Sequence, residues 1–132
     1  MPALVRNRSV PNIVVSNADY ERLTDLATAS LERLPEVAAE LLEEMDRARI
    51  VSDRSVPANV VRMGSTVTFR SDDGRQLTET LVYPVDEDSD AHKISVMTPV
   101  GAALIGLAEG QSISWTARDG RSHRLTVEKV RQ

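Results

Sequence analysis

A strand that runs directly into a short helix, at residues 94–107, constrains the fold of this chain most strongly. The segment reads ISVMTPVGAALIGL, in which the apolar residues Ile94 and Val96 alternate with polar ones before a compact apolar run begins. The alternation predicts a strand, and the apolar run predicts a buried helix. Thr98 can cap that helix through its hydroxyl, and Pro99 suits the first helical position because its missing N–H would be unpaired there anyway.

Two glycines define this helix further. Gly101 lies inside it, where glycine costs roughly 1 kcal/mol relative to alanine, so we expect a close backbone approach at this position. Gly106 suits the left-handed conformation that closes a helix. The predicted helix therefore begins after Thr98 and ends before Gly106.

The segment TPVGAALIG is similar to the SPxGxALLG segment in the C-terminal domain of bacterial Gre-type transcript cleavage factors. Further motifs follow in an order and spacing typical of that family, and the resemblance covers residues 13–130. These motifs are MGSTV from Met63, LVYP from Leu81, SVM from Ser95 and EGQSISW from Glu109. The resemblance implies a C-terminal domain with an FKBP-like fold and a protein that works on RNA polymerase.

The length of 132 residues allows one hydrophobic core with an attachment and is too short for two independent domains. The chain has no cysteine, which excludes disulfides, thiolate metal ligands and cysteine nucleophiles. A net charge of −4 argues against binding nucleic acid by neutralising phosphates, so we expect no direct sequence-specific nucleic-acid contact. A basic group near the C-terminus is interpreted as the solvated faces of two strands, in preference to a nucleic-acid patch. Its members are Arg118, Arg121, Arg124, Lys129 and Arg131.

No run in the sequence approaches the ~20 apolar residues that cross a bilayer, and the N-terminal residues lack the apolar centre of a secretory signal. We therefore expect a cytoplasmic protein with no membrane contact. Residues 1–11 show no periodicity and are predicted to be a loose end. Residues 13–15 form a short apolar run that is either a strand or a hydrophobic peg.

The sequence predicts two helices after this run. Ser16 and Asp19 form a variant of the capping box, followed by an apolar stripe to about Leu31. Pro35 suits the first turn of a second helix, whose apolar residues follow a heptad-like seam. We expect an antiparallel helical hairpin, a short coiled coil. Its seam residues Leu23, Leu41 and Met45 are expected to pair mainly with one another; the alternative is that both helices cover the sheet.

The remaining chain has strand character, which places the protein in the α+β class. Period-two alternation and turn signals at residues 71–74 and 119–120 predict a twisted, mostly antiparallel sheet of about five strands with one short helix. We assign residues 1–50 to the peg and hairpin and residues 51–132 to the sheet domain, with residues 51–58 as a polar hinge. The acidic residues 86–90 lack the glycine and distant glutamate of a calcium loop, so a solvated loop is favoured.

The sequence carries little sign of catalysis. His92 and His123 fall in separate strands without an acid at a telling spacing, and no phosphate-binding or metal motif is present. An FKBP-like fold raises the alternative of a prolyl isomerase, whose pocket is lined with aromatic residues. The sheet domain has only Phe69, Tyr83 and Trp115, which are expected in the core. We therefore predict a protein that is not an enzyme, with no catalytic residue, no metal and no cofactor.

The resemblance implies two candidate sites. The first is the hairpin tip, with Glu32, Arg33 and Glu36. Gre factors resemble this architecture with a longer hairpin, whose tip motif, like GDLxENxEY, supplies acids that help to hold magnesium in the polymerase. The tip here reads LERLPE and lacks that motif, which argues against transcript cleavage. Its acids are either functional or ordinary charges at a helix end.

The second candidate site is the corner formed by Met97, Thr98, Pro99 and Val100. In Gre factors the matching corner meets the rim of the polymerase secondary channel with an acid or serine before Ser-Pro. Here Met97 replaces that acid, and we expect it to be exposed and to offer an apolar contact. The alternative is that Thr98 and Pro99 only cap the helix.

The resemblance implies a regulator that binds RNA polymerase near the secondary channel and competes with Gre factors without cleaving transcripts, and we expect it to be a monomer. A true cleavage factor that acts with polymerase-bound magnesium is the first alternative, and an isomerase is the second.

Overall fold

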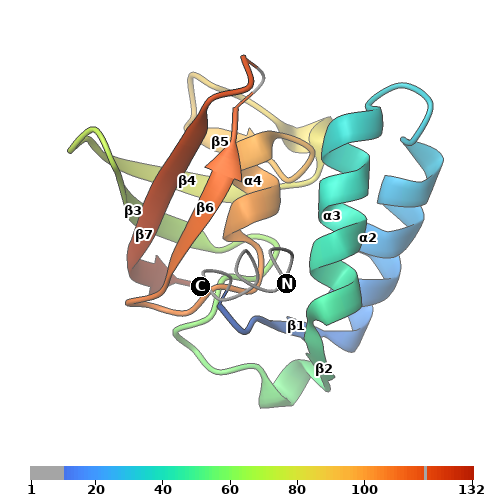
Figure 1. The fold of residues 1–132 in the computed structure, drawn as a ribbon. Coiled ribbons are helices and arrows are strands. Elements are labelled where there is room, and N and C mark those ends of the chain that lie inside the picture. The colour runs from blue at the N-terminus through green and yellow to red at the C-terminus, as the bar shows by residue number, and fades with distance from the viewer. Residues whose placement is uncertain (1–10, 118) are drawn as a thin grey trace, which may run out of the picture.

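The computed structural model describes residues 11–117 and 119–132 and has an α+β architecture (Figure 1). The predicted loose end, apart from Pro11, and Arg118 of the basic group lie outside the described residues. The helices are α2 (Asn17–Ala29), α3 (Pro35–Arg47) and α4 (Pro99–Leu104), with short 3₁₀ turns η1 (Asp53–Ser55) and η2 (Pro84–Asp86). The strands are β1 (Val14–Ser16), β2 (Arg49–Val51), β3 (Thr66–Ser71), β4 (Gln76–Val82), β5 (Lys93–Ser95), β6 (Ser112–Thr116) and β7 (Ser122–Arg131).

Five strands form one sheet in the order β5–β4–β3–β7–β6. Neighbouring strands are antiparallel except for β4 and β5, which run parallel. The β3–β4 turn contains Gly74 with a φ of 90°, a conformation that favours glycine, as the SDDG segment predicts. A register shift between Thr68 and Phe69 marks a bulge against β7, which increases the local twist. The predicted sheet of about five strands with one short helix is confirmed.

Two short strands, β1 before α2 and β2 after α3, pair in parallel and so bring the two ends of the helical segment together. Val15 lies opposite Ile50, and the Arg49 amide donates to the Ile13 carbonyl at 3.0 Å. Residues 13–15 were predicted as either a strand or a peg, and the strand is correct. The sequence did not predict β2, because three residues with exposed Arg49 and Ile50 give no readable alternation. The hinge expected from residue 51 therefore begins inside a strand.

Helices α2 and α3 lie side by side and are joined by a short loop, so that the chain reverses direction between them (Figure 1). The hydroxyl of Ser16 accepts from the Asp19 amide at 3.1 Å, which confirms the predicted helix start. Helix α2 ends at Ala29, earlier than the expected Leu31, and α3 begins at Pro35 as predicted. No helix among the described residues is long and apolar enough to cross a membrane.

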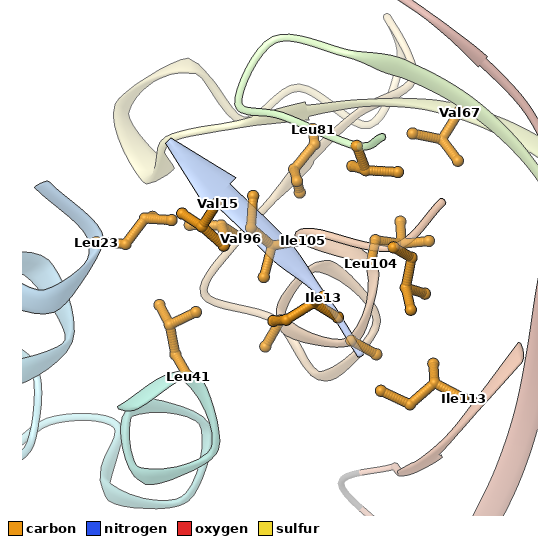
Figure 2. Close-up of a cluster of buried hydrophobic side chains, with 14 of the residues drawn as sticks. Ile13, Val15, Leu23, Leu41, Val67, Leu81, Val96, Leu104, Ile105 and Ile113 are labelled. Atoms are coloured by element: carbon orange, nitrogen blue, oxygen red, sulfur yellow. The ribbon is translucent and has the colours of Figure 1, made fainter. Parts of the chain in front are cut away.

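One hydrophobic core joins the helices to the sheet. Figure 2 shows Leu23 of α2 and Leu41 of α3 pointing toward Val15 and Ile13, and both leucines are fully buried. The same cluster continues through α4 to Val67 of β3 and other sheet residues. Burial of one such side chain stabilises the fold by about 1.5–3 kcal/mol. The seam residues that were expected to pair mainly between the helices therefore also serve the core of the sheet domain.

Candidate functional site

Hydrogen bonds within the chain fix the turn from β5 into α4. The Thr98 hydroxyl donates to the Ser95 carbonyl at 2.7 Å and accepts from the Gly101 amide at 3.1 Å. The Ser95 hydroxyl in turn accepts from the Met97 amide at 2.9 Å. Pro99 occupies the first turn of α4, as predicted. Thr98 therefore caps α4, and the two hydroxyls hold the backbone of the corner in one shape.

Met97 is buried, so its expected role as an exposed apolar contact is wrong. Its side chain is only 4% exposed and belongs to the hydrophobic core. Strand β5 ends at Ser95, and the alternation of buried and exposed side chains ends with it. The next two side chains, Val96 and Met97, are both buried. Thr98, Pro99 and Val100 are partly exposed. These three residues alone form the surface of the corner.

The exposed corner borders two hollows. One, of about 440 Å³, is lined by Thr98, Pro99, Val100 and the indole of Trp115, among others. The other, of about 160 Å³, lies against the sheet, and Val100 and Trp115 line it together with Phe69. A partner that contacts Val100 could therefore also reach Trp115.

The aromatic residues expected in the core differ in their burial. Phe69 is buried, whereas Tyr83 and Trp115 are partly exposed and pack against the edge of the core. The Trp115 ring stacks on the ring of His123, with centroids 4.9 Å apart. The expectation of core burial therefore holds for Phe69 and only in part for Tyr83 and Trp115, which pack against the core from its edge.

The predicted hairpin tip and the predicted corner lie on one groove. Glu32, Arg33 and Glu36 are all exposed. Arg33 and Glu36 line a groove of about 610 Å³ together with Pro99, whereas Glu32 is not among its lining residues. Because α3 packs beside α4, the tip comes close to the corner. Two of the three tip residues thus share a surface with the candidate docking residues.

Acidic side chains of α3 continue along this groove and were not singled out from the sequence. Glu40, Glu43 and Glu44 line a further hollow of about 190 Å³ next to α4. Burial raises the pKa of the Glu40 carboxyl above its ordinary value of 4.5, and the negative charges of Glu43, Glu44 and Glu36 raise it further. The spacing of residues 36, 40 and 44 places three acids on one helix face, a signal that sequence inspection could have found.

The histidines do not form a site. His92 is exposed before β5 with a φ of 56°, whereas His123 lies in β7 with its Nδ1 atom 3.6 Å from Oδ1 of Asp72. Within residues 11–117 and 119–132, no group of three or more histidine, aspartate or glutamate residues could hold a metal ion.

Comparison with known proteins identifies the family. Residues 56–132 match the family described as transcription elongation factor, GreA/GreB, C-term, and residues 11–51 match the Rnk N-terminus family. The chain belongs to the GreA/GreB family. The Gre resemblance noted in the sequence motifs is therefore confirmed.

Two sequence relatives and one solved structure match most of the chain. The chain is 39% identical over 120 residues to the regulator of nucleoside diphosphate kinase of Escherichia coli K12, covering 90% of this chain and 88% of the relative. It is 30% identical over 111 residues to the transcription elongation factor GreA of Azorhizobium caulinodans, covering 83% of this chain and 68% of that protein. A solved structure of a GreA/GreB elongation factor from Nitrosomonas europaea has a TM-score of 0.73 and 37% identity, covering 92% of this chain and all of that one.

Proposed function

We propose that the protein is a transcription regulator that binds RNA polymerase near its secondary channel and competes there with Gre factors without stimulating transcript cleavage. Membership of the GreA/GreB family and similarity to the E. coli regulator of nucleoside diphosphate kinase support this proposal. In it, the protein acts as a cytoplasmic monomer. The sheet domain, which we take to be FKBP-like, is the docking platform, and the helical hairpin points toward the channel.

The observation that carries the proposal is the fixed, partly exposed corner at Thr98, Pro99 and Val100. Thr98 and Pro99 match the Gre corner in sequence, and their backbone is held by the hydrogen bonds to Ser95 and Gly101. A preorganised surface loses little conformational entropy when a partner binds. Because Met97 is buried, Val100 supplies the apolar contact of this corner.

A binding experiment with a charged substitution tests the docking site. Val100→Glu introduces an acid in the first turn of α4, where the helix dipole favours it. Because Val100 also packs against the edge of the core, thermal unfolding is used to check that the variant is folded. We expect it to weaken binding to core polymerase roughly tenfold, well beyond the ~0.5 kcal/mol of a neutral surface change. The matched control is Val85→Glu, at a valine that is 88% exposed and distant from the corner in sequence. Binding would be measured by competition titration, with and without a Gre factor. Equal affinities for the two variants would exclude the corner as the docking site.

Transcript cleavage is the second candidate function, because Glu32 and Glu36 are exposed at the hairpin tip. We expect no cleavage, since the tip lacks the Gre motif. Stalled transcription complexes supplied with magnesium would be incubated with the wild-type protein. Cleavage that is lost in Glu32→Ala or Glu36→Ala would replace the proposed function with that of a cleavage factor.

A further inference from the structure

A groove runs along α3 and is lined on its other side by residues of α4 and β6. Figure 1 shows α4 next to α3. The groove consists of the hollows of about 610 Å³ and 190 Å³, which share Glu40, Pro99 and Thr116 in their lining. We call this surface the α3 groove. It extends from Arg33 at the hairpin tip to Glu44 near the end of α3, and Arg33 is the one basic residue among those that line the two hollows.

The floor of the α3 groove is largely apolar. Leu34 at its tip end is 37% exposed although it is a large hydrophobic residue. Toward the other end, Pro99 and Trp115 are the partly exposed apolar residues of the floor, and Ala102, Ala103 and Ile113 beside them are already buried. Water that covers such a concave apolar surface is released when an apolar side chain binds there.

The wall formed by α3 is strongly acidic. Glu44 pairs with Arg47, but Glu36, Glu40 and Glu43 form no ion pair with any residue that the structure describes. Partial burial disfavours the charge of Glu40, and the nearby charges of Glu43, Glu44 and Glu36 disfavour it further, so the pKa of Glu40 is raised. Cations from outside the chain would remove this unfavourable energy.

We propose that the α3 groove binds a basic amphipathic segment of a protein partner. Its lysine or arginine side chains pair with Glu36, Glu40 and Glu43, while its apolar side chains pack on Pro99 and Trp115. The acids span about two helical turns of α3, or roughly 10 Å, so a segment of two to three turns fits. The negative wall disfavours phosphates and acidic peptides. The inference goes beyond polymerase docking, because it concerns a second surface along α3. Of the corner residues only Pro99 lines it, and Trp115 lies between the two surfaces.

A synthetic peptide tests the groove directly. The probe is a helical peptide about three turns long, with lysine on one face and leucine on the other. The matched peptide carries glutamate in place of lysine. We expect the full-length protein to bind the lysine peptide and not the glutamate peptide. The affinity for the lysine peptide should fall as the salt concentration increases. Trp115 is the only tryptophan of the chain and lines the groove, so its emission should shift on binding. Binding without a shift would place the peptide elsewhere and overturn the proposal.

Charge-matched variants separate the groove from general electrostatic attraction. Glu40→Gln combined with Glu43→Gln should weaken peptide binding about five- to tenfold. The control combines Glu21→Gln with Glu87→Gln, which removes the same charge at two exposed positions outside the groove and should change binding less than about twofold. Equal weakening by both pairs would overturn the proposal. Thr116→Phe, at an exposed strand position inside the groove, should block binding without unfolding the protein.

Two alternative occupants of the α3 groove are the N-terminal segment of the chain and a second copy of the chain. Peptide binding tests the first, and the oligomeric state tests the second. If Arg6→Glu with Arg8→Glu in the full chain strengthened peptide binding, the chain's own N-terminal segment would be the occupant. If the protein formed dimers that Glu40→Gln with Glu43→Gln dissociated, a second copy would be the occupant. Either result would overturn the proposal. Glu40→Gln with Glu43→Gln should change binding to core polymerase less than about twofold, so the groove and the polymerase-docking corner can fail independently.

Discussion

A Cβ atom added to Gly101 would lie 2.1 Å from the carbonyl oxygen of Ser95. Helix α4 and the end of β5 therefore meet backbone against backbone, and no side chain fits between them. The close approach that we expected from a glycine inside a helix is confirmed. It fixes the angle between β5 and α4, and with it the direction in which Thr98, Pro99 and Val100 face.

Gly101→Ala should destabilise the protein by about 3 kcal/mol, because α4 must move away from Ser95. At a solvent-exposed helix position the same change would add about 1 kcal/mol of stability. The sign of the change in unfolding free energy therefore shows whether Gly101 is packed against Ser95. Urea unfolding measures the difference. The reverse change at an exposed helical site, Ala39→Gly, should cost only about 1 kcal/mol and serves as the control. A more stable Gly101→Ala protein would mean that α4 can shift freely.

Met97→Asp should unfold or strongly destabilise the protein, by about 3 kcal/mol or more, because it buries an unpaired carboxylate. The sequence alone suggested an exposed Met97 and hence almost no effect. Met97→Leu keeps the volume and should cost less than about 1.5 kcal/mol. Thermal unfolding of both variants measures the contrast. A melting temperature of Met97→Asp equal to that of the wild type would restore Met97 as a surface residue.

Glu40→Gln should stabilise the protein at neutral pH and not in acid. The pKa of Glu40 is raised in the folded state, mainly by burial and then by Glu43, Glu44 and Glu36. The folded protein therefore holds the Glu40 proton more tightly than the unfolded chain does. Protonated Glu40 stabilises the fold fully below its ordinary pKa of 4.5, and this stabilisation is lost as the pH rises through the raised pKa of the folded state. Glutamine imitates the protonated form at every pH.

The gain from Glu40→Gln should stay below about 1 kcal/mol, because the side chain is partly solvated. Chemical unfolding at pH 7 and near pH 4 measures its dependence on pH. Glu21→Gln, at an exposed site, is the control and should show little difference between the two conditions. A stabilisation that is larger in acid would contradict the assigned direction of the pKa shift.

The sequence predicted the features that depend on neighbouring residues. Ser16 and Thr98 cap their helices because each hydroxyl lies three residues before the amide that it accepts from. Pro35 begins α3 and Gly106 has a φ of 82°, because proline and glycine restrict or permit backbone angles locally. The alternation of apolar residues was sufficient for the five strands of the main sheet.

Features set by packing between distant segments could not be predicted in this way. Strand β2 forms only because β1 lies beside it, and Met97 is buried only because the chain turns inward at Ser95. The α3 groove depends on α4 and β6 lying next to an acidic helix face. Of the candidate site, the sequence therefore indicated Thr98, Pro99, Val100 and the tip residues but not the wall that Glu40 and Glu43 form.

Leu41→Asp tests whether the helical hairpin is an independent unit, as the division at residue 50 predicts. Leu41 is fully buried in a core that extends from α3 to the sheet, so an unpaired carboxylate there affects both parts. The cost should consume most of the about 5–15 kcal/mol that stabilises a domain. The helical circular dichroism signal and the folded-state fluorescence of Trp115 should therefore be lost together, in one cooperative transition.

Ala39→Asp, on the exposed face of the same helix, is the control and should change stability by no more than about 0.5 kcal/mol. Loss of the helical signal with an unchanged Trp115 environment would show instead that the sheet domain folds without the hairpin.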